Sequence, residues 1–241
     1  MSSTKGKNDP TRKENDFYPT PQWCVDILAK KVGALIETPY RGAEFQIIDL
    51  GAGDGRIGRT VRQAMPDAML TLLDINEPPE RREGEGWIIG DFLRMPMDDI
   101  MRRGPTRKLF VGNPPFSQAT EFIKKVWRWV RTQRSASPHS FTATMSMLLR
   151  LNWLGSEVRA DWMNTNTPNR LTILAPRPSF VVKTRVMEDG TVKKSSNDSS
   201  EYAWTWWETN PVKSPPIEVG VWPLSKAERR VWKEKWRAGL V

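Results

Sequence analysis

The segment with the clearest chemical potential is Asn113-Pro114-Pro115-Phe116, which follows a hydrophobic run over 108–111. Two prolines fix two φ angles and remove two backbone donors, so the loop is stiff and rich in acceptors. The Asn113 side-chain oxygen and the Pro114 carbonyl can each accept one N–H of a planar amino group. Acceptors fixed in this way stabilise the positive charge that develops when the nitrogen attacks an electrophile.

The amino group of adenine is a planar amino group that would need such acceptors. Its lone pair is delocalised into the ring, so the nitrogen is a poor nucleophile until hydrogen bonds draw the lone pair out of the ring. Phe116 adds an aromatic face on which a base rotated out of a helix can stack. No general base is needed before attack, since the proton can pass to solvent afterwards. That suits a chain whose single histidine is His139. The alternative interpretation of the same loop is a rigid structural turn.

A second loop with chemical potential runs over 49–55, with the sequence Asp-Leu-Gly-Ala-Gly-Asp-Gly. Closely spaced glycines let a backbone turn sharply and approach a ligand. The next predicted strand ends at Asp74, about 20 residues beyond Gly53, where an acid can accept hydrogen bonds from ribose hydroxyls. The spacing does not distinguish a dinucleotide from another nucleoside ligand, and an ordinary glycine-rich turn is the alternative.

Alternating strand and helix patterns must position these two loops. Hydrophobic periodicity predicts helices over 22–36, 56–65, 118–131 and 155–163. It predicts strands over 45–50, 69–75, 87–89, 108–111, 141–149, 170–174, 201–208 and 217–222, the last two as an antiparallel pair. This order predicts a doubly wound α/β domain with a mostly parallel sheet and an antiparallel edge.

Composition narrows the class of protein. Hydrophobic residues make up 38% and charged residues 27%, a globular balance, and the net charge of +9 favours a polyanionic partner or simply solubility. Cys24 is the only cysteine, which excludes an intrachain disulfide and fits a reducing compartment. A single histidine excludes a His-rich zinc site, and we expect no metal. The chain has neither a membrane-length apolar run nor a signal segment, so we expect a cytoplasmic location, near DNA if that is the partner.

The domain organisation predicted from these patterns has three parts: a tail over 1–16, one domain over 17–224 with a basic insert over 183–200, and a basic helix over 225–241. Asp189-Gly190 is a hairpin turn signal within the insert. The candidate nucleic-acid-binding residues flank that turn: Lys183, Arg185, Lys193 and Lys194. A β-ribbon fits the major groove, although an exposed polar hairpin is the alternative. The final helix is either a phosphate-binding surface or a helix packed through its tryptophans.

The glycine loop and its downstream acids resemble those of class I S-adenosylmethionine-dependent methyltransferases. The resemblance assigns the cofactor to Asp49, Gly51 and Gly53 in the loop and assigns its ribose to Asp74, followed by Ile75. It assigns the adenine of the cofactor to Asp91 and Phe92, directly after the next predicted strand. It also implies a Rossmann-like sheet of seven strands.

Asn-Pro-Pro-Phe resembles the Asn/Asp-Pro-Pro-aromatic motif of amino-methyltransferases that act on adenine. The segment over 16–21 resembles their N-terminal cofactor motif, with Tyr18 and Thr20 as contacts; a helix cap at Thr20 is compatible with this role. The resemblance implies that Asn113 contacts the cofactor as well. The motif order resembles the γ group of DNA methyltransferases, and the second half resembles small phage-type enzymes. The resemblance implies transfer of a methyl group to N6 of adenine in DNA, with S-adenosylhomocysteine as product.

One departure from the large γ enzymes is that this chain has no room for a separate target-recognition domain. We therefore expect short or relaxed sequence specificity. Three other functions stay open: an RNA adenine methyltransferase, a protein glutamine methyltransferase and an inactive binding subunit. The sequence does not indicate the recognition site or the oligomeric state.

Overall fold

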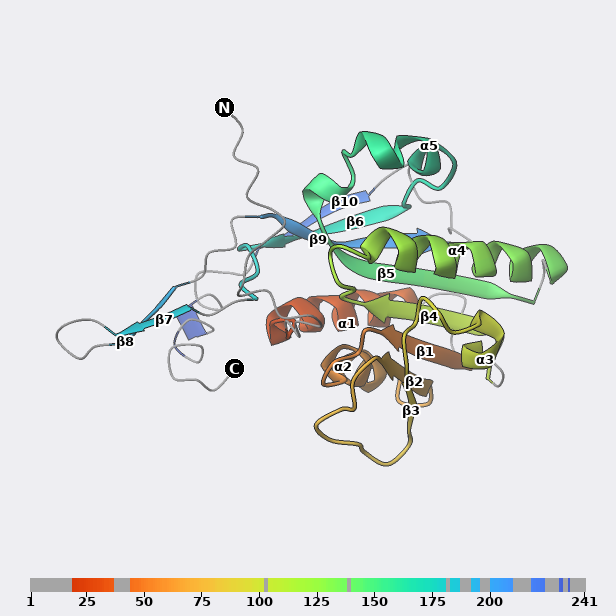
Figure 1. Cartoon of the computed structure of the whole chain (residues 1–241), viewed down its shortest axis with the longest axis horizontal. Coiled ribbons are helices and arrows are strands. Elements are labelled where there is room, and N and C mark those ends of the chain that lie inside the picture. The colour runs from red at the N-terminus through yellow and green to blue at the C-terminus, as the bar shows by residue number, and fades with distance from the viewer. Residues whose placement is uncertain are drawn as a thin grey trace.

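The computed structural model describes residues 19–36, 44–101, 104–137, 140–180, 183–186, 192–195, 200–209 and 218–223, together with 230, 231 and 234. Its main sheet has eight strands in the order β10-β6-β9-β5-β4-β1-β2-β3 (Figure 1). These are β1 (Phe45–Leu50), β2 (Met69–Asp74), β3 (Glu85–Ile89), β4 (Arg107–Gly112), β5 (Thr142–Arg150), β6 (Arg170–Ala175), β9 (Tyr202–Glu208) and β10 (Glu218–Pro223). The helices are α1 (Gln22–Ile36), α2 (Arg56–Ala64), α3 (Met97–Met101), α4 (Ala119–Ala136) and α5 (Glu157–Thr165).

Five neighbouring strands of the sheet are parallel. β1 pairs in parallel with both β2 and β4, and β3 and β5 extend these pairs outward. The chain first builds the β1-β2-β3 side and then returns to build the β4-β5 side, so the strand order reverses between β1 and β4. Ligands of open α/β sheets bind outside the carboxyl ends of the strands at such a reversal. The glycine loop follows β1 and the Asn-Pro-Pro-Phe loop follows β4, so both predicted loops lie at this point.

The other side of the sheet contains the antiparallel pairing. β9 runs antiparallel to both β5 and β6, while β10 pairs with β6 in parallel. The predicted Rossmann-like, mostly parallel sheet with antiparallel pairing on one side is therefore confirmed. The sheet contains the eight strands that the hydrophobic pattern predicted, one more than the seven implied by the resemblance. The predicted pairing of the last two strands is wrong because β6 lies between β9 and β10. Residues 202–207 of β9 are all buried, as expected of a strand with neighbours on both edges and layers on both faces.

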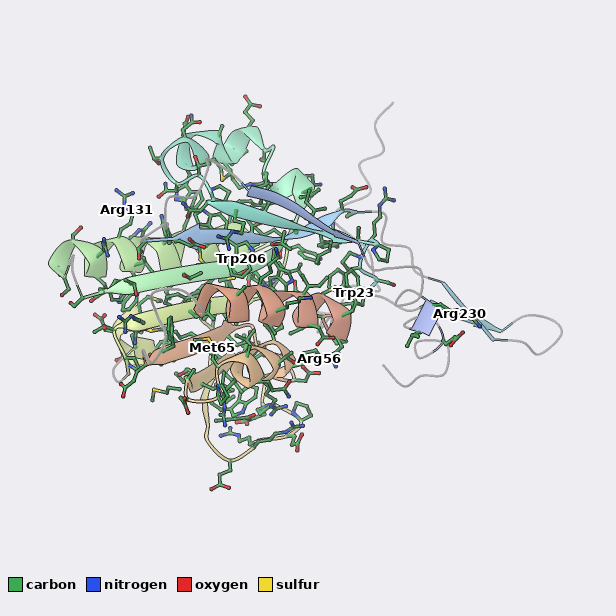
Figure 2. The ribbon with its side chains drawn as sticks, turned by 180° about the vertical axis from the view of Figure 1, so that it is seen from behind. Trp23, Arg56, Met65, Arg131, Trp206 and Arg230 are labelled. Carbon is green, nitrogen blue, oxygen red and sulfur yellow. The ribbon has the colours of Figure 1, made fainter. Side chains whose placement is uncertain are left out.

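Helices cover both faces of the sheet. Buried side chains of α1 and α2 form one hydrophobic cluster with alternate strand residues such as Leu72 and Trp206. Those of α3 and α4 form a second cluster with the intervening residues, including Leu73 and Trp207. Figure 1 shows α4 in front of the sheet, and Figure 2, from the opposite side, shows α1 in front of it. The four predicted helices are confirmed, whereas α3 and the 3-10 turn Leu151–Trp153 are too short for their periodicity to be detected.

The predicted basic hairpin is confirmed as a separate two-stranded ribbon of β7 (Lys183–Val186) and β8 (Val192–Ser195). Its register sets Arg185 opposite Lys193 and Thr184 opposite Lys194. The predicted turn at 189–190 and the tail over 1–16 lie outside the described residues. Of the predicted C-terminal helix, only 230, 231 and 234 are described, and these are helical. Among the described residues, no helix has both the length and the apolar character to cross a bilayer, and no cluster of three potential metal ligands occurs.

Candidate active site

The glycine loop turns directly off the end of β1. Gly51, Gly53 and Gly55 have φ angles of 71°, 57° and 78°, a region that side-chain-bearing residues rarely adopt. The amides of Gly51 and Ala52 both donate to the Leu73 carbonyl at 2.9 Å, which ties the loop to the neighbouring strand β2. The backbone of the loop is therefore fixed at the carboxyl edge of the sheet, close to where a ligand would lie.

A fourth glycine, Gly58, was missed by the sequence analysis. A Cβ atom there would lie 2.7 Å from Leu72 Cδ2 and 3.1 Å from the Asp49 Cβ, so a larger residue would require the Leu72 side chain or α2 to shift. The spacing Gly53-x-Gly55-x-x-Gly58 is the glycine pattern of nucleotide-binding strand-to-helix turns. The signal was therefore present in the sequence.

Asp49 is buried beneath this helix, where its Oδ2 accepts the Gly58 amide at 2.8 Å. Its Oδ1 is buried without a hydrogen-bond partner. Burial raises the pKa of Asp49 to about 7; the Gly58 hydrogen bond opposes the shift and the nearby charges of Asp54 and Asp74 add to it. Asp49 therefore holds the start of α2, and its Oδ1 remains buried without a donor.

The raised pKa of Asp49 predicts that the free energy of unfolding falls as pH rises from about 4 to about 7. The carboxyl is protonated in the folded protein but ionised in the unfolded chain across this window, so stability present at low pH is lost through the folded pKa. The loss is expected to be about 2–4 kcal/mol. Urea unfolding at several pH values between 4.5 and 7.5 measures it.

Asp49→Asn is the control for that measurement, because an amide keeps an acceptor for Gly58 and does not ionise. Its stability is expected to change much less over the same window. Glu85 acts in the opposite direction and only at the acid end of the window, because its hydrogen bond from Arg59 lowers its folded pKa to about 2 and its contribution is complete above the unfolded pKa. That contribution is the same in the wild type and in Asp49→Asn. Equal pH slopes in the wild type and in Asp49→Asn would contradict the assignment.

Asp74 ends β2 and faces the glycine loop. Its Oδ2 accepts the Gly53 amide at 2.8 Å and its Oδ1 accepts the Asn76 amide at 2.9 Å. Each carboxylate oxygen can accept a further hydrogen bond, so two acceptor positions remain for ribose hydroxyls. The next side chain, Ile75, is 49% exposed and offers an apolar surface beside the carboxylate.

Asp91 and Phe92 follow β3 and are fixed within their own loop. Asp91 accepts the Leu93 amide at 2.9 Å and pairs with Arg94 at 3.2 Å. The Phe92 ring is buried in the core, 4.7 Å from the ring of Phe122, so a cofactor contact by Phe92 would come from its main chain. Lys125 of α4 donates to the carbonyls of residues 92, 93 and 95 and holds this loop against the helix.

Asn113 follows β4, and the two ends of its amide have different environments. Its Nδ2 donates to the Thr20 Oγ1 at 3.1 Å, whereas its Oδ1 is buried without a partner. Pro114 is buried and Pro115 is exposed. Thr20 is also buried, just before α1, while Tyr18 lies outside the described residues. The structure thus brings Thr20 to Asn113, a pairing that the sequence did not indicate.

The loops after β1 and β4 lie against each other. A Cβ atom on Gly112 would lie 2.4 Å from the Leu50 carbonyl oxygen, so only glycine allows β4 to approach β1 this closely. A Cβ atom on Gly51 would lie 3.9 Å from the Asn113 carbonyl oxygen. The glycine loop and the Asn-Pro-Pro-Phe loop therefore form one continuous site.

Phe116 is half-buried in an aromatic cluster rather than free. Its ring lies 5.7 Å from that of Tyr202 and 6.2 Å from that of Phe180, and the Arg150 guanidinium lies 4.5 Å from its centroid. The Arg150 Nε also donates to the Tyr202 hydroxyl at 3.0 Å. The sequence did not indicate that these three partners meet at Phe116, because they come from β5, β9 and the segment after β6.

Comparison with known proteins adds the fold family. No family model and no curated protein sequence matches the chain. Among solved structures, a type I restriction-modification system methyltransferase subunit from Streptococcus thermophilus matches with a TM-score of 0.53 and 10% identity, over 92% of this chain and 53% of that one. The chain has a Rossmann-like methyltransferase fold.

Two further solved structures match with lower TM-scores. The 23S rRNA methyltransferase ErmE has a TM-score of 0.39 and 15% identity, over 88% of this chain and 78% of that one. The precorrin-6y C5,15-methyltransferase from Geobacter metallireducens has a TM-score of 0.42 and 14% identity, over 83% and 95%. A fold alone does not determine the substrate, so the substrate must be argued from the residues of the site.

Proposed function

We propose that this chain transfers a methyl group from S-adenosylmethionine to N6 of adenine in DNA. The observation that carries the proposal is the amide of Asn113, whose nitrogen is bound to Thr20 and whose oxygen is buried without a partner. A buried acceptor without a donor is costly, so a ligand that supplies an N–H is favoured there. An adenine amino group supplies two, one for Asn113 and one for the neighbouring Pro114 carbonyl.

The residues around the glycine loop fit S-adenosylmethionine. Asp74 retains acceptor positions for the ribose, and the exposed Ile75 offers an apolar contact to the adenine ring. The free oxygen of Asp49 can accept a donor from the methionine end. We assign Tyr18 and the main chain around Asp91 and Phe92 to the remaining contacts. When bound, this cofactor supplies an electrophilic methyl group and leaves as S-adenosylhomocysteine.

The residues of the catalytic loop act on the amine. Asn113 Oδ1 and the Pro114 carbonyl accept its two N–H groups and draw its lone pair out of the ring. Both hydrogen bonds strengthen as positive charge develops on the nitrogen, which favours the transition state over the ground state. The extra proton is then lost to solvent. Adenine inside a duplex cannot reach this loop, so the base must be flipped out, and Phe116 is proposed to stack on it.

The position of the basic insert supports a nucleic acid as substrate. Phe180 and Tyr202 flank the insert in sequence, their rings lie 4.8 Å apart, and both contact Phe116. The ribbon of β7 and β8 therefore leaves the domain beside the proposed base site. Its four basic residues and the net charge of +9 favour phosphate contacts. A two-stranded ribbon fits the DNA major groove, which favours DNA as the nucleic acid.

Removing the basic side chains of the ribbon is expected to weaken DNA binding and leave cofactor binding intact. In a variant with alanine at Lys183, Arg185, Lys193 and Lys194, the slope of log affinity against log salt should fall by up to about 0.9 per lost phosphate contact. Fluorescence anisotropy with a labelled duplex at several salt concentrations measures this slope. A charge-matched control has alanine at Arg62, Arg81, Arg82 and Arg128. Equal slopes in the two variants would mean that the ribbon makes no backbone contacts.

The proposed activity is tested by incubating the protein with methyl-labelled S-adenosylmethionine and matched DNA, RNA or unfolded protein. The nucleic acids are then digested and the nucleosides identified by mass spectrometry. N6-methyldeoxyadenosine is the expected product. Label found only as N6-methyladenosine in RNA, or only on glutamine, would mean that RNA or protein is the substrate and DNA is not. The absence of label from DNA, RNA and protein would overturn the proposed activity.

A further inference from the structure

We propose that Thr20 is a positioning residue that orients the Asn113 amide so that its oxygen, not its nitrogen, faces the substrate amine. The inference rests on the proposed function, because it concerns the same site. The resemblance to methyltransferases predicted that Thr20 would contact the cofactor. The geometry gives its hydroxyl a protein partner, the Nδ2 of Asn113, at 3.1 Å.

The orientation matters because the two ends of an amide have opposite hydrogen-bonding character. With the nitrogen on Thr20, the oxygen is left to accept an N–H from the substrate. A 180° rotation would present the Asn113 Nδ2 to the substrate amine, donor against donor. In the rotated amide the Thr20 hydroxyl would donate to Oδ1, and both N–H groups would lie without a partner at the buried position that Oδ1 now occupies. The observed orientation pairs one N–H with Thr20 and leaves Oδ1 as the buried atom without a partner. Two unpaired buried donors cost more than one unpaired acceptor, so an amide bound to Thr20 favours the productive orientation.

Thr20 is itself held in place. Its side chain is only 3% exposed, and its carbonyl accepts the Arg56 Nη1 at 3.1 Å. Arg56 in turn binds Asp54 of the glycine loop through Nε, at 2.8 Å to Oδ2. Figure 2 labels Arg56 at the amino end of α2, near the amino end of α1 where Trp23 is labelled. Thr20 therefore connects the glycine loop to the Asn-Pro-Pro-Phe loop and cannot move away from Asn113 without breaking these bonds.

The test compares Thr20→Val, which keeps the shape and removes the hydroxyl, with Thr20→Ser, which keeps the hydroxyl. Thr20→Val is expected to lower kcat about tenfold, as for the loss of one hydrogen bond in the transition state. The KM for DNA and the Kd for S-adenosylmethionine should stay within about twofold of wild type. Thr20→Ser should retain most of the wild-type kcat. Thr20→Ala replaces Thr20→Val if the latter does not fold.

A second measurement follows the contact without turnover. The side-chain amide resonances of Asn113, identified by their absence in Asn113→Asp, should shift in Thr20→Val and stay near their wild-type position in Thr20→Ser. Unchanged kcat and unchanged resonances in Thr20→Val would overturn the inference. A raised Kd for S-adenosylmethionine with normal kcat would make Thr20 a cofactor contact instead. Wild-type protein that methylates no nucleic acid, with resonances that do shift, would overturn the proposed function and with it the role of Thr20, while leaving the contact itself established.

Discussion

Replacing Asn113 by alanine is expected to lower kcat about 10²–10³-fold, with little change in the KM for DNA. The side chain is proposed to accept a hydrogen bond that strengthens only as the amine becomes positive, so its loss affects the transition state more than the bound substrate. The observation behind this expectation is the partnerless Asn113 Oδ1 at the carboxyl end of β4. Steady-state and single-turnover kinetics on an adenine-containing duplex measure the effect. Single-turnover kinetics also shows whether the chemical step, and not product release, has been slowed.

Asn113→Asp is the matched variant, because it keeps an acceptor of the same length. It should retain more activity than Asn113→Ala, although it lacks the N–H that binds Thr20. Cofactor affinity, measured by calorimetry, should be unchanged in both variants if the two prolines keep the loop in shape. Wild-type kcat in a folded Asn113→Ala protein would mean that this residue plays no part in the chemistry.

The parts of the site that were predictable from the sequence are those where a strand and the functional loop are adjacent along the chain. Asp49 to Gly55 and Lys108 to Phe116 each combine a hydrophobic strand with residues of restricted conformation. The structure places both loops at the reversal of strand order. Asp74 was found in the same way, as an acid at the end of the next strand. Its bond to the Gly53 amide shows that it also shapes the loop.

The parts that were not predictable depend on contacts between distant segments. The sequence around Gly112 does not indicate that a glycine is required there. The requirement appears in the structure, where a Cβ atom on Gly112 would lie 2.4 Å from the Leu50 carbonyl oxygen. Arg150 and Tyr202 meet over Phe116 because β5 and β9 are antiparallel neighbours, with these two residues opposite each other in register. The position of β9 in the sheet was missed for the same reason, since strand order is decided by tertiary packing and not by the pattern within a strand.

The aromatic cluster changes the expected behaviour of Phe116. An isolated stacking platform would leave one face open, but the Arg150 guanidinium lies over this ring and is bonded to Tyr202. Under the proposed function, a flipped base would share the ring with Arg150 or displace it. Phe180 and Tyr202 flank in sequence the insert that carries β7 and β8, and their rings are in contact. We therefore expect base entry to be coupled to the proposed DNA contact by the ribbon.

Replacing Asp74 by alanine is expected to raise the Kd for S-adenosylmethionine about 10–150-fold, the equivalent of about 1.5–3 kcal/mol for charge-assisted hydrogen bonds to the ribose. Calorimetric titration of the folded variant measures the change. Asp74 has two roles that this variant alone does not separate, because its carboxylate also accepts the Gly53 and Asn76 amides. Loss of the ribose contact and distortion of the glycine loop would both weaken binding.

The two roles of Asp74 are separated by varying the ligand as well as the protein. Adenosine and 2′,3′-dideoxyadenosine differ only in the ribose hydroxyls, so their affinity ratio reports the hydroxyl contacts. The wild type is expected to prefer adenosine, and Asp74→Ala to bind both about equally, which gives a double-mutant-cycle coupling between the carboxylate and the hydroxyls. If Asp74→Ala weakens both nucleosides but keeps the wild-type preference, the carboxylate acts through Gly53 alone. An unchanged Kd in the folded variant would remove Asp74 from the cofactor site altogether.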